Sequence, residues 1–141
     1  MTQEDKNILL KDLCARLPYG VKIHYHYYRK PIVKDEDRDL DFSDVESLKY
    51  NIEYVEDGWC EISWKPYLRP MSSMTEEECK ELGDLPATFE GIGEVIPNVP
   101  YYIEVTRPEQ IDWLNENHFD YRGLISMGLA LEAPEGMYKT E

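Results

Sequence analysis

The stretch TRPEQIDWLNENHFDYRGLISMGLAL, residues 106–131, carries the densest set of agreeing structural signals in the chain. Thr106 followed three residues later by Glu109 forms a capping box, which predicts the start of a helix. Asn117 is a weak helix former and predicts its end. We expect Ile111, Trp113 and Leu114 on the buried side of this helix, and Asp112, Asn115 and Glu116 mostly on the wetter side.

A second, short helix is expected to follow, because Asp120 is placed to cap residues Tyr121–Met127. Gly128 suits the left-handed conformation that ends a helix. The two predicted helices meet at a corner rich in aromatic residues, so we expect this corner to be a centre of packing.

The N-terminal part predicts a helix followed by a strand. Thr2 can cap the helix, and Pro18 stops it. The strand Val21–Tyr28 alternates, so that His24 and His26 share one face. The apolar stripe of the helix is expected to comprise Leu9, Leu10, Leu13, Cys14 and Leu17.

Two further capping boxes, Ser43–Glu46 and Thr75–Glu78, predict short helices. Between them, Asp57-Gly58 predicts a hairpin that joins strands Ile52–Val55 and Trp59–Trp64. The prolines of WKPYLRP, residues 64–70, predict a short extended segment, because proline cannot donate to a strand ladder.

Downstream, Gly83 is expected to end the second of these helices. The segment from Asp84 to Pro100 is rich in Gly and Pro and predicts irregular structure. Tyr101–Val105 predicts a strand that leads into the 106–131 stretch. Helices and strands mix without βαβ alternation, so the sequence predicts one α+β domain over residues 1–141. We expect a mainly antiparallel sheet with three to five short helices.

The chain has 141 residues and a net charge of −14, and most of that charge lies in two segments. Residues 35–57 hold ten acidic residues against two basic ones, and residues 76–84 hold five against one. Such a surface repels nucleic acids and anionic membranes and can attract a basic protein or simply keep the chain soluble. The candidate acidic interaction surface consists of Asp35, Glu36, Asp37, Asp39, Asp41, Glu76, Glu77 and Glu81.

Asp35, Asp37, Asp39 and Glu46 fall at positions 1, 3, 5 and 12 of a calcium-loop template. Position 6 is Leu40, where the sharp turn requires glycine, and a strand and a proline precede the segment where a helix should lie. The pattern therefore favours an acidic loop over a calcium site.

His24 and His26 have the spacing that lets two imidazoles on a strand share a transition metal. A third ligand would have to come from His118, Asp120 or Cys60. Paired histidines on a solvated strand face are the alternative, and we expect no cofactor. The three cysteines form no CxxC pair, which excludes a zinc ribbon and indicates reduced thiols of a cytoplasmic protein.

A small ligand is the other candidate. Lys65, Tyr67 and Arg69 form a basic and aromatic segment that could hold a phosphate or carboxylate, and a proline-stiffened connection with solvated cations is the alternative. His118 and Arg122 could form a polar pocket near Asp120, although ordinary ion pairing of Arg122 also accounts for them. The sequence contains no GxSxG, HExxH or GxxxxGK[ST] motif.

Three phrases of the sequence resemble a family of small proteins of unknown activity found in gut bacteria of the Bacteroides type and in their phages. These phrases are DLCARLPYGVK (12–22), KPYLRPMSSMTEEE (65–78) and WLNENHFDYRGLISMGLALEAPEGMY (113–138). The resemblance implies a compact cytoplasmic protein with a phage association, and it brings no ligand or catalytic residue.

These observations favour a non-enzymatic module that binds a protein of the host, with no direct binding to nucleic acid or membranes. One form of it is an acidic inhibitor that imitates nucleic acid. The alternative is a small ligand- or metal-binding domain, or a hydrolase that uses the histidines or the Lys65–Arg69 segment.

Overall fold

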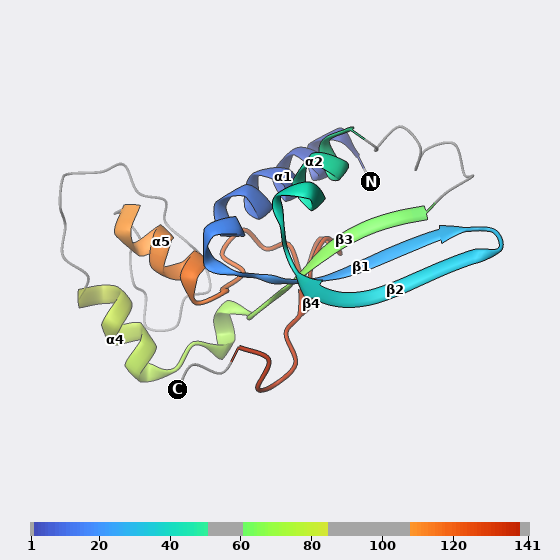
Figure 1. Ribbon diagram of the computed structural model, residues 1–141. Coiled ribbons are helices and arrows are strands. Elements are labelled where there is room, and N and C mark those ends of the chain that lie inside the picture. Colours follow the sequence, from blue (N-terminus) through green and yellow to red (C-terminus); the bar gives the residue numbers. More distant parts are fainter. Residues whose placement is uncertain (1, 51–60, 85–107, 139–141) are drawn as a thin grey trace.

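The computed structural model describes residues 2–50, 61–84 and 108–138 (Figure 1). Within them the chain forms four α-helices and a four-stranded sheet in the order β2-β1-β3-β4. The elements are α1 (Gln3–Arg16), β1 (Lys22–Arg29), β2 (Ile32–Asp39), α2 (Phe42–Tyr50), β3 (Glu61–Leu68), α4 (Glu76–Asp84), α5 (Pro108–Glu116) and β4 (Leu131–Glu132). β1 is antiparallel to both neighbours, and only β3 and β4 run parallel, which confirms the predicted α+β fold with a mainly antiparallel sheet.

Two helix starts follow the sequence prediction. Thr2 accepts a hydrogen bond from the backbone N–H of Asp5 at 3.0 Å, and the Asp5 carboxylate accepts from the N–H of Thr2. Thr75 and Glu78 form the same reciprocal pair at 3.2 and 3.0 Å. Both boxes satisfy amide groups that have no partner within the first turn of a helix.

The start of α2 differs from the prediction. The capping pair is Asp41 and Asp44, since the backbone N–H of each donates to the carboxylate of the other. Ser43 donates its hydroxyl to Asp41, and Glu46 is exposed. The Ser43–Glu46 box was wrong because Asp41 offers a carboxylate that bonds the same first-turn amides and lies two residues earlier.

The acidic segment predicted as a loop is a strand. Asp35, Asp37 and Asp39 lie on β2, which pairs along its whole length with β1. Extended backbone separates alternate side chains too far to wrap a calcium ion as a tight loop does, so the calcium-loop template does not apply. The β1–β2 hairpin projects away from the helices in Figure 1.

The main core lies between one face of the sheet and the pair α1 and α2, which cover the same side in Figure 1. Ile23, Trp64 and Leu68 supply the sheet side of this core. Leu9 and Leu13 of α1 are buried as predicted, whereas Cys14 is exposed, because its position points away from the sheet. Pro66 sits inside β3, opposite Ile23, so the extended segment is part of the sheet.

A second core joins α4, α5 and the corner that follows α5, residues His118–Asp120. Trp113 stacks on Phe119 with ring centroids 5.7 Å apart, and Leu114 is fully buried. Asn115 was expected on the wet side but is buried, because its side-chain oxygen accepts a hydrogen bond from the Tyr121 hydroxyl at 3.0 Å.

The predicted helix over Tyr121–Met127 does not form, and these residues make a series of turns. Gly123 adopts a φ of 77°, which a right-handed helix does not allow. Asp120 still caps the segment, since its carboxylate accepts from the N–H groups of Leu124 and Ile125 at 2.8 and 2.9 Å. Gly128 is left-handed as predicted, with a φ of 77°.

Several predictions lie outside the described residues: the Thr106 capping box, the Asp57-Gly58 hairpin with Ile52–Val55 and the first residues of Trp59–Trp64, the irregular segment after Asp84, and the strand Tyr101–Val105. α4 continues through Gly83 to Asp84, one residue beyond the predicted end. No helix in the described parts of the chain has both the length and the apolar character needed to cross a membrane.

Candidate functional site

Polar side chains of β1 and β2 form a ladder on the face of the sheet opposite the main core. His24 pairs with Asp37 and His26 with Asp35 in the strand register, so each imidazole lies beside a carboxylate. The Nδ1 atoms of His24 and His26 lie 2.8 and 2.6 Å from Asp37 and Asp35, and Nε2 of His24 lies 3.2 Å from Asp35. We call these four residues the histidine–aspartate ladder.

Hydrogen bonds within the ladder shift the pKa values of His24, Asp35 and Asp37. The hydrogen bond to Asp37 raises the pKa of His24 above its usual value, against a smaller opposing effect of burial. The pKa of Asp37 is lowered by His24 and by the Tyr67 hydroxyl, which donates to it at 2.8 Å. The pKa of Asp35 is lowered in the same way by His26 and His24. The His24–Asp37 pair therefore favours a charged imidazole and a charged carboxylate together.

The same geometry bears on the predicted metal site at His24 and His26. Within residues 2–50, 61–84 and 108–138, no group of three or more His, Cys, Asp or Glu side chains is arranged to hold a metal ion. The His24 nitrogens face carboxylate oxygens at hydrogen-bond distance. Cys60, a possible third ligand, lies outside the described residues. His118 and Asp120 lie at the corner after α5, where Asp120 caps a turn.

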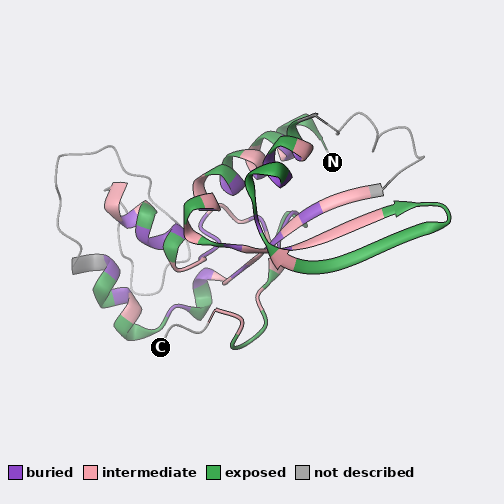
Figure 2. Cartoon of the chain, in the orientation of Figure 1, coloured by how far each residue is buried: buried purple, intermediate pink, exposed green. Residues whose placement is uncertain are grey.

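The acidic residues separate into two groups on different elements. Asp35, Glu36, Asp37 and Asp39 lie on β2 and Asp41 directly after it, and all five are exposed. Glu76, Glu77 and Glu81 are exposed on α4, at the other end of the molecule in Figure 1. Figure 2 shows β2 as the most continuously exposed strand of the sheet.

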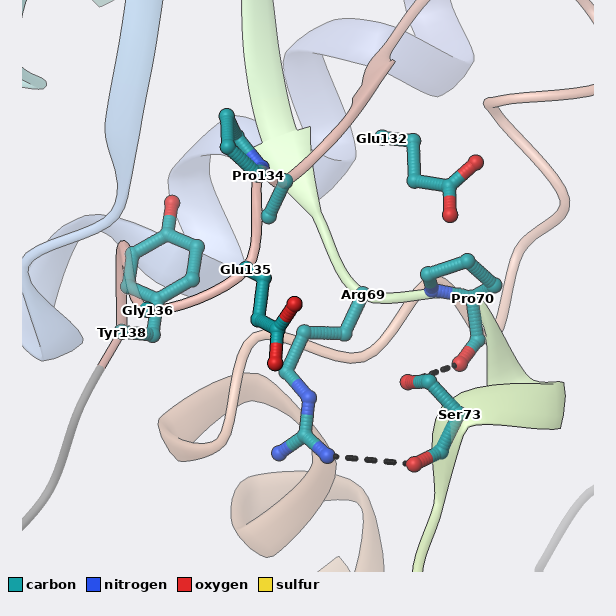
Figure 3. Close-up of a pocket in the computed structure, with 9 residues that line it drawn as sticks. Arg69, Pro70, Ser73, Glu132, Pro134, Glu135, Gly136 and Tyr138 are labelled. Atoms are coloured by element: carbon teal, nitrogen blue, oxygen red, sulfur yellow. Dashed lines mark hydrogen bonds between the residues drawn. The ribbon is translucent and has the colours of Figure 1, made fainter.

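A hollow of about 500 Å³ lies beside Arg69, at the end of β3 (Figure 3). We call it the Arg69 hollow, and its walls include Arg69, Pro70, Glu132, Pro134, Glu135 and Tyr138. Residues from the end of β3 and from the segment after β4 meet here because the Ala133 N–H donates to the Leu68 carbonyl at 2.8 Å. The hollow is open to solvent and combines polar and apolar walls.

Arg69 is held in a bidentate ion pair with Glu78, at 2.7 and 2.8 Å. Its guanidinium also lies over the Phe119 ring, 4.1 Å from the centroid. Burial raises the pKa of the Glu78 carboxyl, but the hydrogen bonds from Arg69 and from the Thr75 backbone outweigh it and hold that pKa below its usual value. A phosphate or carboxylate at Arg69 would have to displace Glu78.

The other residues predicted to bind a ligand are dispersed over the molecule. Lys65 lines a separate hollow of about 270 Å³. Arg122 lines a hollow of about 730 Å³, and its side chain also pairs with the buried Asp12 at 3.2 Å. Tyr67 joins the ladder through its hydroxyl. The predicted segment around residues 65–69 therefore does not form one site.

The imidazole of His118 stacks on the ring of Tyr138, with the two ring centroids 3.7 Å apart. Burial, together with the charges of Arg16, Arg69 and Lys22, lowers the pKa of His118 to about 4. Its φ of 65° is left-handed, and its Nδ1 is buried without a hydrogen-bond partner within the described residues. This imidazole is neutral near pH 7 and packs at the corner.

Sequence reasoning missed two features of these sites. Asp12 and Arg16 form a fully buried ion pair at 2.8 Å, and Arg16 also donates to the Phe119 carbonyl at 2.6 Å. Their i, i+4 spacing was the only available signal, and exposed pairs share it. No sequence pattern marked Glu132 and Glu135 as members of the Arg69 hollow, because only the fold brings them beside β3.

No family model, no curated protein and no solved structure matches this chain in comparisons with known proteins.

Proposed function

We propose that this protein is a non-enzymatic interaction module that binds a basic protein partner through its β2 strand. The observation that carries the proposal is that β2 is an edge strand of the sheet, with seven of its eight residues exposed and acidic side chains along it. An edge strand presents backbone N–H and C=O groups that can pair with another chain.

Apolar and acidic groups lie side by side on this strand. Ile32 and Val33 are 56% and 57% exposed at its start, and Phe42, just after its end, is 63% exposed. Large apolar side chains surrounded by charged ones are typical of protein interfaces. Charge complementarity then specifies a partner surface rich in Lys and Arg, and it speeds the encounter at low salt.

A more specific form of the proposal is imitation of nucleic acid. Asp35, Asp37 and Asp39 share one face of β2 at backbone steps of about 6.6–6.8 Å. Basic groups of the target would replace His26, His24 and Lys22 as the partners of these carboxylates. A host protein that normally binds nucleic acid would be its target, in a cytoplasm that keeps Cys14 and Cys79 as free thiols. Duplex DNA added to the complex should then release the partner at constant salt.

The proposal is tested by affinity capture from a host extract with three forms of the chain. One is unchanged, one carries Asp35→Asn, Asp37→Asn and Asp39→Asn, and one carries Glu76→Gln, Glu77→Gln and Glu81→Gln. Each of the two variants loses three negative charges, so their net charges are equal. The expected result is a basic protein captured by the unchanged chain and by the α4 variant, but not by the β2 variant.

An equal reduction of capture in both variants would show that net charge alone attracts the partner, and undiminished capture by both would likewise overturn the role of β2. A captured partner without a basic surface would overturn the proposal as well. Thermal unfolding of all three forms checks that the substitutions leave the fold intact.

A further inference from the structure

The Arg69 hollow combines apolar walls with two carboxylates that have no partner within the described residues. Pro70, Pro134 and Tyr138 supply the apolar surface. Glu132 and Glu135 are exposed at the rim, and no ion pair or hydrogen bond engages either side chain in the described parts of the chain. Figure 3 shows both glutamates among the residues that line the hollow.

The positive charge in this hollow is already neutralised. Both terminal nitrogens of Arg69 are bonded to Glu78, so this ion pair contributes no net charge. Glu132 and Glu135 therefore leave the hollow with a net negative charge. The sequence alone suggested an anion site at Arg69, whereas the structure makes the unpaired groups carboxylates, which attract cations.

We propose that the Arg69 hollow receives a cationic side chain, arginine or lysine, of a partner protein. Such a side chain buries its methylene stem against apolar surface while its charged end stays near water and acidic groups. The prolines and the tyrosine ring suit the stem, and the two rim carboxylates suit the charged end. The proposal rests on the basic partner of the proposed function and adds a second contact on a different part of the molecule.

The walls of the hollow are fixed before any ligand arrives. The Tyr138 hydroxyl donates to the Tyr67 carbonyl at 2.6 Å and accepts from the Lys22 N–H at 2.9 Å. Its ring is stacked on His118. A site that is already ordered loses little conformational entropy on binding, which favours even a small ligand.

The experiment titrates the full-length, isotope-labelled protein with N-acetyl-arginine amide and follows backbone amide shifts by NMR. N-acetyl-citrulline amide is the neutral control of the same shape, and N-acetyl-lysine amide tests the second cation. The expected result is saturable binding of the arginine and lysine probes in the millimolar range, with shifts at residues 132–138, and no saturation by citrulline. Each of Glu132→Gln and Glu135→Gln should weaken arginine binding about two- to fivefold, as exposed ion pairs do.

The matched control is Glu76→Gln with Glu77→Gln on α4, which removes two charges without touching the hollow. It should leave the affinity within about twofold, as expected of solvent-screened charges that do not line the hollow. Equal binding of citrulline, or equal weakening by the α4 control, would overturn the proposal. Inorganic phosphate that shifted the same residues while arginine did not would restore the anion site instead.

The outcome is separate from that of the proposed function. Loss of capture by the β2 variant with no arginine binding at the hollow would reject only the present inference. Arginine binding with capture unaffected by β2 would reject only the role of that strand.

Discussion

The β1–β2 hairpin and the corner after α5 shift the pKa of a histidine in opposite directions, His24 on the hairpin and His118 at the corner. On the hairpin, carboxylates beside His24 raise its pKa. At the corner, burial and three surrounding cations lower the pKa of His118 to about 4. The residue type alone therefore does not predict its charge, because the elements packed around it decide.

The same contrast extends to stability. The corner joins α1, β3 and α5 through buried groups, whereas the hairpin is made mostly of exposed side chains. Substitutions at the corner should therefore cost much more free energy than substitutions on the hairpin.

Asp12→Ala should lower the free energy of unfolding by about 3–5 kcal/mol, because it leaves Arg16 buried without its partner. Asp12 and Arg16 are both fully buried, and Asp12 also accepts from Arg122. Chemical denaturation of the variant and of the unchanged chain measures the difference. A double variant, Asp12→Leu with Arg16→Met, should recover part of the loss, and a single-variant loss below about 1 kcal/mol would contradict a buried, coupled pair.

Leu114→Ala should cost about 2–5 kcal/mol, since Leu114 is fully buried in the second core. The matched hairpin substitution, Val33→Ala, also removes apolar carbons but at a side chain that is 57% exposed, and it should change stability by about 0.5 kcal/mol or less. Urea midpoints compare the two variants. Similar losses at both positions would refute the division into a packed corner and an exposed hairpin.

His118 should make the protein less stable in acid. A histidine whose folded pKa lies below its unfolded value of about 6.5 stabilises the native state above that pH. The contribution is lost as pH falls from about 6.5 towards 4, because the buried ring must then accept a proton next to Arg16 and Arg69. Unfolding free energies measured at several pH values should show this slope. The variant His118→Asn tolerates the left-handed backbone and should reduce the slope of stability against pH. An unchanged slope would contradict a lowered pKa of His118.

The contribution of His24 to the free energy of unfolding should change with pH in the opposite direction. Its raised folded pKa gives stability that is complete below about 6.5 and is lost as pH rises through the folded pKa. The lowered pKa of Asp37 gives stability that is present above its unfolded value, 3.8, and is lost below it. NMR titration should place the His24 pKa above 6.5, and Asp37→Asn should move it down. A His24 pKa at or below 6.5 in the unchanged chain would argue against the ladder.

The sequence predicted several of the elements whose signals are local. The cap at Thr2 and the box at Thr75 need only residues three apart, and the alternation of β1 needs only its own side chains. β2 was missed because both of its faces are exposed and polar, so it lacks the apolar alternation of a half-buried strand. β2 is extended because it pairs with β1, and this pairing cannot be read from the residues of β2 alone.

The candidate sites were less predictable for the same reason. The sequence placed His24 and His26 on one face, but their carboxylate partners come from a strand that was taken for a loop. Arg69 was identified, yet its pairing with Glu78 depends on where α4 lies relative to the end of β3. Glu132 and Glu135 reach the hollow only through the parallel pairing of β4 with β3.

Tyr67 belongs to both regions that the sites occupy. Its hydroxyl bonds to Asp37 on the hairpin, while its carbonyl receives the Tyr138 hydroxyl behind the Arg69 hollow. A fluorine atom placed on the ring of Tyr67 would therefore register protonation at the hairpin, and a carbon-13 label at its carbonyl would register occupancy of the hollow through Tyr138. One residue would report on two surfaces through two different nuclei.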